Sequence, residues 1–235
     1  MKPIAIFRHT LNEGAGYFAT YLDRRGIPWR LVRIDEGDAV PGDPQLFSGL
    51  VFMGGPMSVN DDLPWIAPVL ELIRAGVAAD VPALGHCLGG QLMAKALGGV
   101  VTRNAIKEIG WGEVHVQGHA EAESWFHHVR PSFLSFHWHG ETFSLPPGSQ
   151  RVLSNAHCEN QAFAIGKHLA MQCHIEMTRE TVDSWCATGA REIERSTSPA
   201  VQVVDAIKFD LERRLADLHR AADGVYECWT RGLAA

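Results

Sequence analysis

The sequence predicts an α/β fold built on a doubly wound, three-layer, mostly parallel sheet with antiparallel additions. Short apolar runs of strand length alternate with segments of helical period through the first hundred residues, and strands joined in this way pair in parallel through helical crossovers. The composition, 46% hydrophobic and 20% charged, is that of a globular chain. A length of 235 residues allows one domain or two. Because no repeat, low-complexity run or linker interrupts the chain, we predict a single domain over residues 1–235.

The first half of the chain contains four predicted strands and three predicted helices. The strands are residues 4–7, 29–34, 50–53 and 81–84, and the helices are centred on Phe18 and Leu22, on residues 66–77 and on residues 88–96. The second strand alternates apolar and charged residues, which is typical of a half-buried or edge strand. Asp61 and Asp62 are placed to cap the second helix, with Pro64 in its first turn. The third helix should stop at Gly98.

The second half shows a different pattern. Residues 101–170 contain several short strand-like runs, a possible hairpin turn at Gly166-Lys167 and no long helical period, so we expect antiparallel strands added to the same sheet. Near the carboxyl end, apolar residues at spacings of three and four predict one long amphipathic helix that packs over the sheet. These residues are Val201, Val204, Ile207, Leu211, Leu215 and Leu218.

Charge and cysteine content narrow the classes of partner and compartment. Lys and Arg number 21 against 27 Asp and Glu, a net charge of −6, so nucleic acid and anionic membranes are poor partners. The amino terminus lacks a signal-peptide core, and no apolar run approaches the roughly 18 residues of a membrane helix. The five cysteines form no C-x-x-C pair, which argues against a disulfide framework or a structural zinc site. We therefore expect a reduced, cytoplasmic protein.

Cys87 has the sequence context of a nucleophile. Gly85 and Gly89 flank it at positions −2 and +2, where a predicted strand turns into a predicted helix. This is the nucleophile-elbow pattern with Cys in place of Ser. The amino end of the helix favours the thiolate, which is the nucleophilic form.

A base and an oxyanion site are also predicted. His174 ends a strand-like run, and Glu176 two residues later can share one side of an extended segment and hold one imidazole nitrogen. Cys173 should point to the opposite face, into the core. The strand ending at Gly54-Gly55 exposes main-chain N–H groups, which can stabilise an oxyanion together with the amide of Leu88.

Two pairs of histidines, His127-His128 and His137-x-His139, suggest a metal site. No Asp, Glu or Cys completes an obvious site nearby, so we predict no metal. The chain has no Walker-type phosphate loop and no dinucleotide fingerprint, and we predict no cofactor.

These segments together resemble the class I glutamine amidotransferases, in particular free-standing members similar to the glutaminase domain of GMP synthase. Six segments match in the family's order: residues 54–59, 85–92, 108–111, 136–141, 160–163 and 172–176. The resemblance implies a flavodoxin-like sheet and a Cys87–His174–Glu176 triad that hydrolyses the side-chain amide of glutamine through a thioester. It also implies an oxyanion hole formed by the amides of Gly55 and Leu88. Finally, it implies substrate contacts from Gln91 and from the turn at His139 and Gly140.

The chain departs from the family's pattern at three positions. Ile175 stands where the family usually has Pro, Cys173 replaces a common aromatic residue, and His86 replaces an apolar residue. None of these changes removes a catalytic atom, and we expect His86 to pack under the elbow.

Three functions remain open. The first is a glutaminase whose ammonia acceptor is unknown and whose partner could be a separate synthetase or acceptor protein. The second is a γ-glutamyl peptidase or hydrolase that uses the same thioester chemistry. The third is a non-catalytic regulatory homologue, for which Ile175 is the support.

Overall fold

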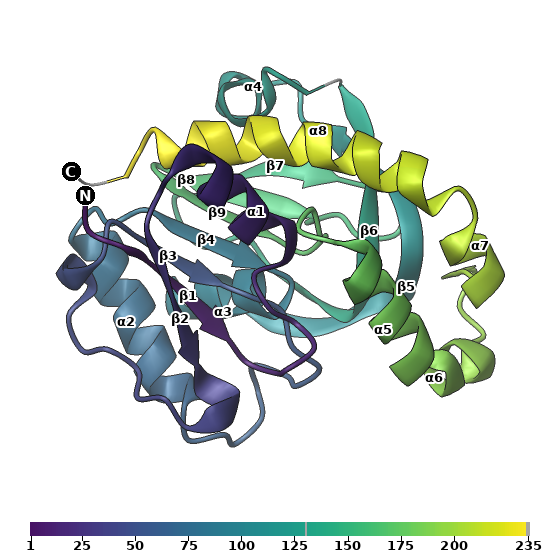
Figure 1. The fold of residues 1–235 in the computed structure, drawn as a ribbon, viewed down its shortest axis with the longest axis horizontal. Coiled ribbons are helices and arrows are strands. Elements are labelled where there is room, and N and C mark those ends of the chain that lie inside the picture. The colour runs from purple at the N-terminus through teal and green to yellow at the C-terminus, as the bar shows by residue number, and fades with distance from the viewer. Residues whose placement is uncertain (130, 234–235) are drawn as a thin grey trace.

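The computed structural model describes residues 1–129 and 131–233. Within these ranges, ten strands form one sheet in the order β10-β5-β7-β8-β9-β4-β3-β1-β2, with β6 paired to β5 (Figure 1). No helix in the described part of the chain is long and apolar enough to cross a membrane.

The parallel part of the sheet has the strand order 2-1-3-4 followed by β9, which is the flavodoxin-like order. Its strands are β1 (Ile4–Arg8), β2 (Trp29–Arg33), β3 (Gly49–Phe52), β4 (Ala83–His86) and β9 (His168–Met171). The four strands predicted in the first half are confirmed to within two residues, and β2 lies at the edge as its alternation indicated.

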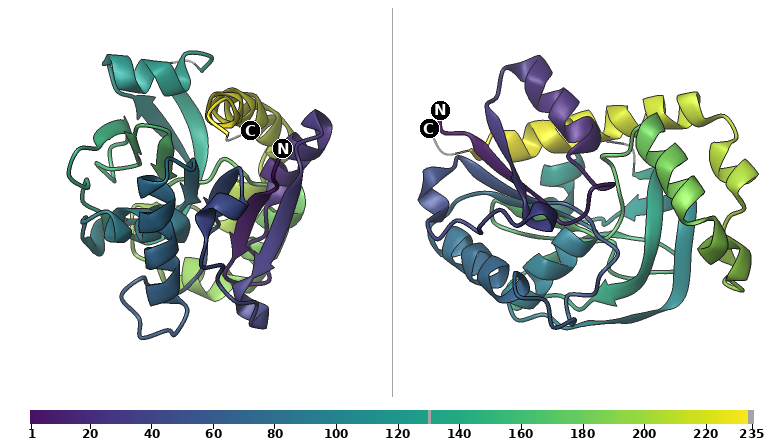
Figure 2. Two further views of the ribbon diagram at one scale, coloured as in Figure 1. Left: turned by 90° about the vertical axis from the view of Figure 1, so that its left-hand side faces the viewer. Right: turned by 60° about the horizontal axis from the view of Figure 1, so that its bottom comes forward.

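Helices cover both faces of this parallel part, giving three layers. Alternate residues of β1 divide between two cores: Ala5 and Phe7 face α2 (Ile66–Ala78) and α3 (Leu88–Ala96), whereas Ile4 and Ile6 face α1 (Gly16–Arg25) and α8 (Leu211–Thr230). Figure 2 shows α8, in yellow, on the opposite side of the sheet from α2 and α3. The predicted doubly wound architecture is therefore confirmed.

The antiparallel part is dominated by two long strands rather than several short ones. β5 (Val101–Val116) and β6 (Ser132–Phe143) pair along most of their length, with a register shift between Arg103 and Glu108. β7 (Gln150–Ser154) and β8 (Ala162–Ile165) connect β5 to β9. The hairpin predicted at Gly166-Lys167 joins β8 to β9, where Ile165 pairs with His168.

The region between β5 and β6 contains one short helix, α4 (Ala120–Phe126), capped by the His119 ring, which accepts from the Ala122 amide. Two expectations about local structure are wrong: the cap of α2 and the single long helix near the carboxyl end. Asp61 accepts a hydrogen bond from the amide of Ser58, in the loop, instead of capping α2, and Trp65 takes the N-cap position without a side-chain cap.

The predicted long helix near the carboxyl end is divided. Residues 200–201 form the short strand β10 beside β5, residues 204–208 form α7, and α8 begins only at Leu211. Asp210 has φ of 52°, a left-handed conformation that interrupts the helix. Spacing of apolar residues alone could not reveal this break, because both pieces bury the same stripe.

Candidate active site

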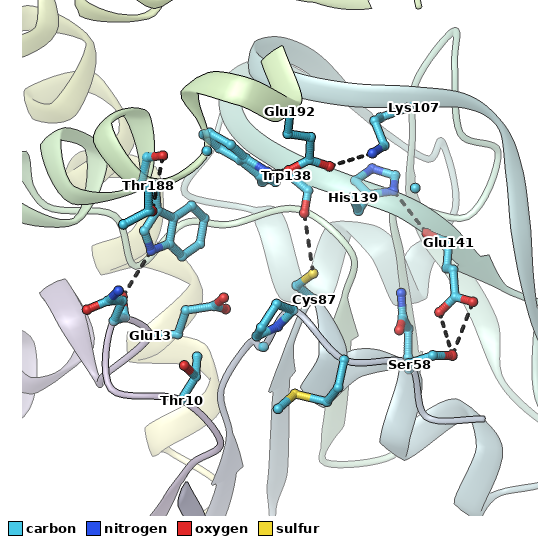
Figure 3. Close-up of a pocket in the computed structure, with 18 residues that line it drawn as sticks. Thr10, Glu13, Ser58, Cys87, Lys107, Trp138, His139, Glu141, Thr188 and Glu192 are labelled. Atoms are coloured by element: carbon cyan, nitrogen blue, oxygen red, sulfur yellow. Dashed lines mark hydrogen bonds and ion pairs between the residues drawn. The ribbon is translucent and has the colours of Figure 1, made fainter. Parts of the chain in front are cut away.

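A cavity of about 550 Å³ opens beyond the carboxyl ends of β3 and β4. Loops after β1 and β3, the amino end of α3, the strands β5 and β6, α5 (Arg179–Thr188) and α6 (Ala190–Arg195) form its walls (Figure 3). This is the crevice where ligands bind in doubly wound sheets. Of the residues predicted for the site, Gly55, Cys87, Gln91, His139 and Gly140 line it.

The main chain around Cys87 is a strained turn that only small neighbours permit. Cys87 itself has φ of 50° and ψ of −108°, and its amide donates to the carbonyl of Met171 at 2.8 Å. A Cβ atom on Gly89 would lie 1.9 Å from the Phe52 carbonyl oxygen, and one on Gly85 would lie 2.6 Å from the main chain of Gly89 and Gly90. The glycines therefore let the elbow fit against β3, with the thiol at the amino end of α3.

His174 and Glu176 lie together in the segment after β9. The Nδ1 atom of His174 is 2.6 Å from Oε1 of Glu176, and the ring packs edge-on against Trp185. The main chain of His174 pairs with Phe136 of β6, which fixes the imidazole between the two parts of the sheet. Its Nε2 atom has no hydrogen-bond partner among the described residues.

Buried charges polarise this pair. Burial alone would lower the pKa of His174, but the charges of Glu176 and of an ionised Cys87 raise it well above its usual value. Burial likewise works against ionised Glu176, yet His174 and His86 bring its pKa down to about 2. The imidazolium and the carboxylate are thus the forms that this site stabilises.

The three positions that depart from the family pattern are all buried. His86 packs under the elbow as expected, but it also lies 3.7 Å from the second carboxylate oxygen of Glu176 and contacts the Tyr226 hydroxyl at 3.3 Å. Cys173 points into the core, and burial raises its pKa to about 12, so it stays a thiol. Ile175 is also a core residue.

Of the two residues expected to supply oxyanion-binding amides, Leu88 directly follows Cys87 in the chain and Gly55 lines the same cavity. A Cβ on Gly55 would lie 2.6 Å from the Met57 sulfur and 2.7 Å from the Leu88 side chain, so Gly55 lies close to Leu88. The Leu88 amide is in the first turn of α3 and has no intrahelical acceptor.

The remaining predicted contacts are a buried amide pair and two residues of β6, where the sequence had indicated a turn and the structure has a continuous strand. Gln91 donates to Gln172 at 3.0 Å, and Gln172 in turn donates to the Cys87 sulfur at 3.5 Å. His139 and Gly140 lie on β6 at the edge of the cavity, where the His139 ring bonds to the carbonyl of Glu141. Gln172 lies in the matching segment 172–176, but no pattern in the sequence indicates its contact with Cys87.

Several residues of the cavity were not predicted as site residues. Figure 3 shows Glu13, from the loop after β1, with its carboxyl group directed into the cavity toward Cys87. Burial raises the pKa of Glu13 to about 7, with His174 opposing and Glu176 adding to this shift. Opposite it, the Trp138 carbonyl lies 3.9 Å from the Cys87 sulfur. A Lys107–Glu192 ion pair closes the far wall.

The two histidine pairs noted in the sequence lie in different environments in the structure. His127 and His128 are exposed, and no carboxylate or thiol joins them in a described metal-ligating cluster. By contrast, Glu108 of β5 completes a buried group with His137 and His139, although no acidic partner was expected from the sequence. Strand pairing brings it there, and the sequence did not reveal that pairing.

Comparison with known proteins identifies the class. The family model for class-I glutamine amidotransferases matches residues 17–186, and this chain belongs to that family. Its fold is similar over its whole length to the crystal structure of a glutamine amido transferase from Methylobacillus flagellatus. The two are 42% identical, with a TM-score of 0.97 and 96% of that chain covered. A Thermotoga maritima glutamine amidotransferase is 26% identical over the full chain, which covers 99% of that protein, with a TM-score of 0.87.

Sequence relatives lead to the same family. A putative glutamine amidotransferase-like protein of Salmonella typhimurium, YfeJ, is 28% identical over 79% of this chain and 80% of that protein. The glutamine-hydrolysing GMP synthase of Aromatoleum aromaticum is 34% identical over 56% of this chain. That match spans only 26% of the synthase. The predicted relation to the glutaminase part of GMP synthase is confirmed.

Proposed function

We propose that the chain hydrolyses the side-chain amide of glutamine to glutamate and ammonia. The observation that carries the proposal is the grouping of Cys87, at the amino end of α3, with a histidine that Glu176 holds at 2.6 Å and whose pKa lies well above its usual value. Cys87 lines the same cavity as Gly55. A nucleophile, a base and a group that orients the base are what covalent amide hydrolysis requires.

The chemistry follows from these groups. The Cys87 thiolate attacks the amide carbon, and the amides of Gly55 and Leu88 stabilise the oxyanion. The His174 imidazolium gives its proton to the leaving nitrogen, so that ammonia departs and a thioester forms. His174 then accepts a proton from water as the water oxygen attacks the thioester, which releases glutamate and restores the thiolate.

Glu13 supports a substrate that carries an ammonium group. It forms no ion pair with a described residue, and its carboxyl group is directed into the cavity beside Cys87 (Figure 3). A bound α-ammonium group would stabilise the ionised form of Glu13 and lower its pKa. We therefore assign Glu13 to the amino-acid end of the substrate, together with Gln91. A separate synthetase or acceptor protein for the ammonia stays a prediction.

The test is ammonia release from glutamine by the wild type, Cys87→Ala and the control Cys228→Ala. Cys228 lies on α8 and donates to the Ser124 carbonyl, and neither residue is among those that line the cavity. We expect Cys87→Ala to lose activity and Cys228→Ala to keep it. Equal rates for wild type and Cys87→Ala would contradict the assignment.

A γ-glutamyl peptidase or hydrolase is the second candidate, favoured by the extent of the cavity. Trp138, Trp185 and Thr188 form a wall beyond the thiol, and the volume of about 550 Å³ leaves room for a leaving group larger than ammonia. The ratio of kcat/KM for a γ-glutamyl dipeptide to that for glutamine separates the two. If neither turns over and a glutamine-like electrophile fails to label Cys87, the non-catalytic alternative holds.

A further inference from the structure

Three metal-ligating side chains converge where β5 and β6 pair just after the register shift. Glu108 is the direct partner of His139, and His137 lies two residues along the same strand, so all three side chains project from one face. Their ligand atoms all lie within 4.8 Å of one another, and each residue is at least 95% buried. None of them belongs to the predicted triad.

Each group is oriented by a contact on its outer side. The Nδ1 atom of His139 bonds to the carbonyl of Glu141 at 3.0 Å, and Nε2 of His137 lies 3.4 Å from the carbonyl of Gly112. The two oxygens of Glu108 accept hydrogen bonds from Asn155 at 2.6 Å and Gln161 at 2.8 Å. Histidines whose outer nitrogen donates to a carbonyl, beside a hydrogen-bonded carboxylate, have the arrangement found around protein-bound metals.

The inner nitrogens are left without hydrogen-bond partners. His139 Nε2 is 3.0 Å from Glu108 and His137 Nδ1 is 4.0 Å from the same carboxylate, and neither nitrogen has a hydrogen-bond partner among the described residues. Because the outer nitrogens must donate to carbonyls, the inner ones carry lone pairs in the neutral tautomers. A proton on His139 would form an ion pair with Glu108 but would leave His137 unsatisfied. One cation between the three groups satisfies all of them.

We propose that Glu108, His137 and His139 bind a divalent transition-metal ion of the zinc type. Two imidazoles and one carboxylate are a ligand set that zinc uses, with a water in the fourth position. Zinc bonds of about 2.0–2.2 Å hold ligand atoms roughly 3–4 Å apart, so the side chains need move by less than about 1 Å. The ion would fix β5 to β6 beside the register shift, and with it Trp138, whose carbonyl faces Cys87. The proposal does not depend on the activity.

The test is a Co²⁺ titration of chelator-treated protein, followed by Zn²⁺ competition. It is done in a Cys87→Ala background, so that the cysteine cannot contribute a ligand. We expect one equivalent of Co²⁺ with the visible absorption of a four-coordinate ion, and no sulfur charge-transfer band. His137→Gln and Glu108→Gln should each weaken binding by at least roughly 10-fold. The matched control, His127→Gln/His128→Gln, alters an exposed pair that lacks a carboxylate partner and should bind as the parent does.

Two outcomes overturn the proposal. One is a parent protein that takes up no stoichiometric Co²⁺ or Zn²⁺ and whose melting temperature does not rise with the metal, a result that needs no variant to fold. The other is binding that survives both His137→Gln and Glu108→Gln, or that is lost only in the His127→Gln/His128→Gln control.

Discussion

Cys87 and His174 follow the carboxyl ends of two adjacent parallel strands, β4 and β9, whereas Trp138 and His139 enter the same cavity from the middle of a long antiparallel strand. In the parallel part, main-chain contacts fix the position of Cys87. Its amide donates to the Met171 carbonyl, Gly89 packs against Phe52, and Gly85 packs against Gly89. In the β5–β6 part, side chains define the wall, as in the contacts of Glu192 with Lys107 and Trp138.

The two parts of the site should therefore tolerate substitution differently. A substitution in the parallel part should move or disable one of the proposed reacting groups, because no neighbouring side chain can shift to compensate. A substitution in the β5–β6 wall changes a partly exposed ion pair or a contact with the outer end of the substrate. The first kind should abolish turnover or stability, and the second should alter substrate affinity.

The largest expected effect comes from Glu176→Gln. The amide keeps the shape of the side chain but cannot hold His174 as an imidazolium, so kcat should fall by roughly 10³–10⁴-fold. Steady-state kinetics with glutamine or the preferred γ-glutamyl compound measure this, and circular dichroism verifies that the variant is folded. A loss of less than about 10-fold would remove Glu176 from the proposed triad.

Gly89→Ala should affect stability most. Its Cβ would lie 1.9 Å from the Phe52 carbonyl oxygen, and neither main chain can retreat without moving β3 or α3. We expect the free energy of unfolding to fall by about 3 kcal/mol in urea denaturation. Gly118→Ala is the matched control, because a Cβ there meets nothing within 4 Å. Equal effects in the two variants would show that the elbow is not tightly packed.

His9 provides a pH test of the same packed region. It is 2% exposed at the end of β1, with Nδ1 on the Met53 carbonyl, and burial lowers its pKa from 6.5 to about 4. His9 binds a proton more tightly in the unfolded chain than in the folded protein. Burial of the neutral ring therefore contributes fully to the free energy of unfolding above pH 6.5, and this contribution is lost as the pH falls toward 4. The loss is roughly 2–3 kcal/mol.

His9→Gln should flatten the unfolding free energy between pH 7 and 4 relative to the wild type, measured by urea denaturation at each pH. The exposed His127→Gln should leave the profile unchanged. A wild-type profile that His9→Gln does not alter would mean that folding does not lower the pKa of His9.

The smallest effect is expected in the β5–β6 wall. Lys107 and Glu192 are both more than a third exposed, so their ion pair is weak, and Lys107→Met should leave kcat almost unchanged. KM should rise by about 2–10-fold if Lys107 orders the cavity wall. A large loss of kcat in this variant would break the distinction between the two parts of the site.

The sequence predicts the parallel part well because its information is local. An apolar run, two glycines around Cys87 and a helical period lie within a dozen residues, and together they define a strand, a sharp turn and a helix. His174 and Glu176 also lie two residues apart, so their contact follows from one extended segment.

The β5–β6 part could not be predicted in the same way. Which residue faces Glu108 depends on a register that shifts after Arg103, and no local pattern reveals the shift. Glu13 is separated from Cys87 in sequence and reaches it only through a loop conformation. Asp210 interrupts the last helix by a main-chain angle that the apolar spacing does not record.

The hydrogen bond from the Cys87 amide to Met171 joins the proposed nucleophile to the strand that leads into His174. Local opening of β9 therefore separates both groups in one event, and the same event exposes the Cys87 amide to exchange with solvent deuterium. The protection of that single amide and the fraction of molecules able to turn over substrate are then two readings of one equilibrium.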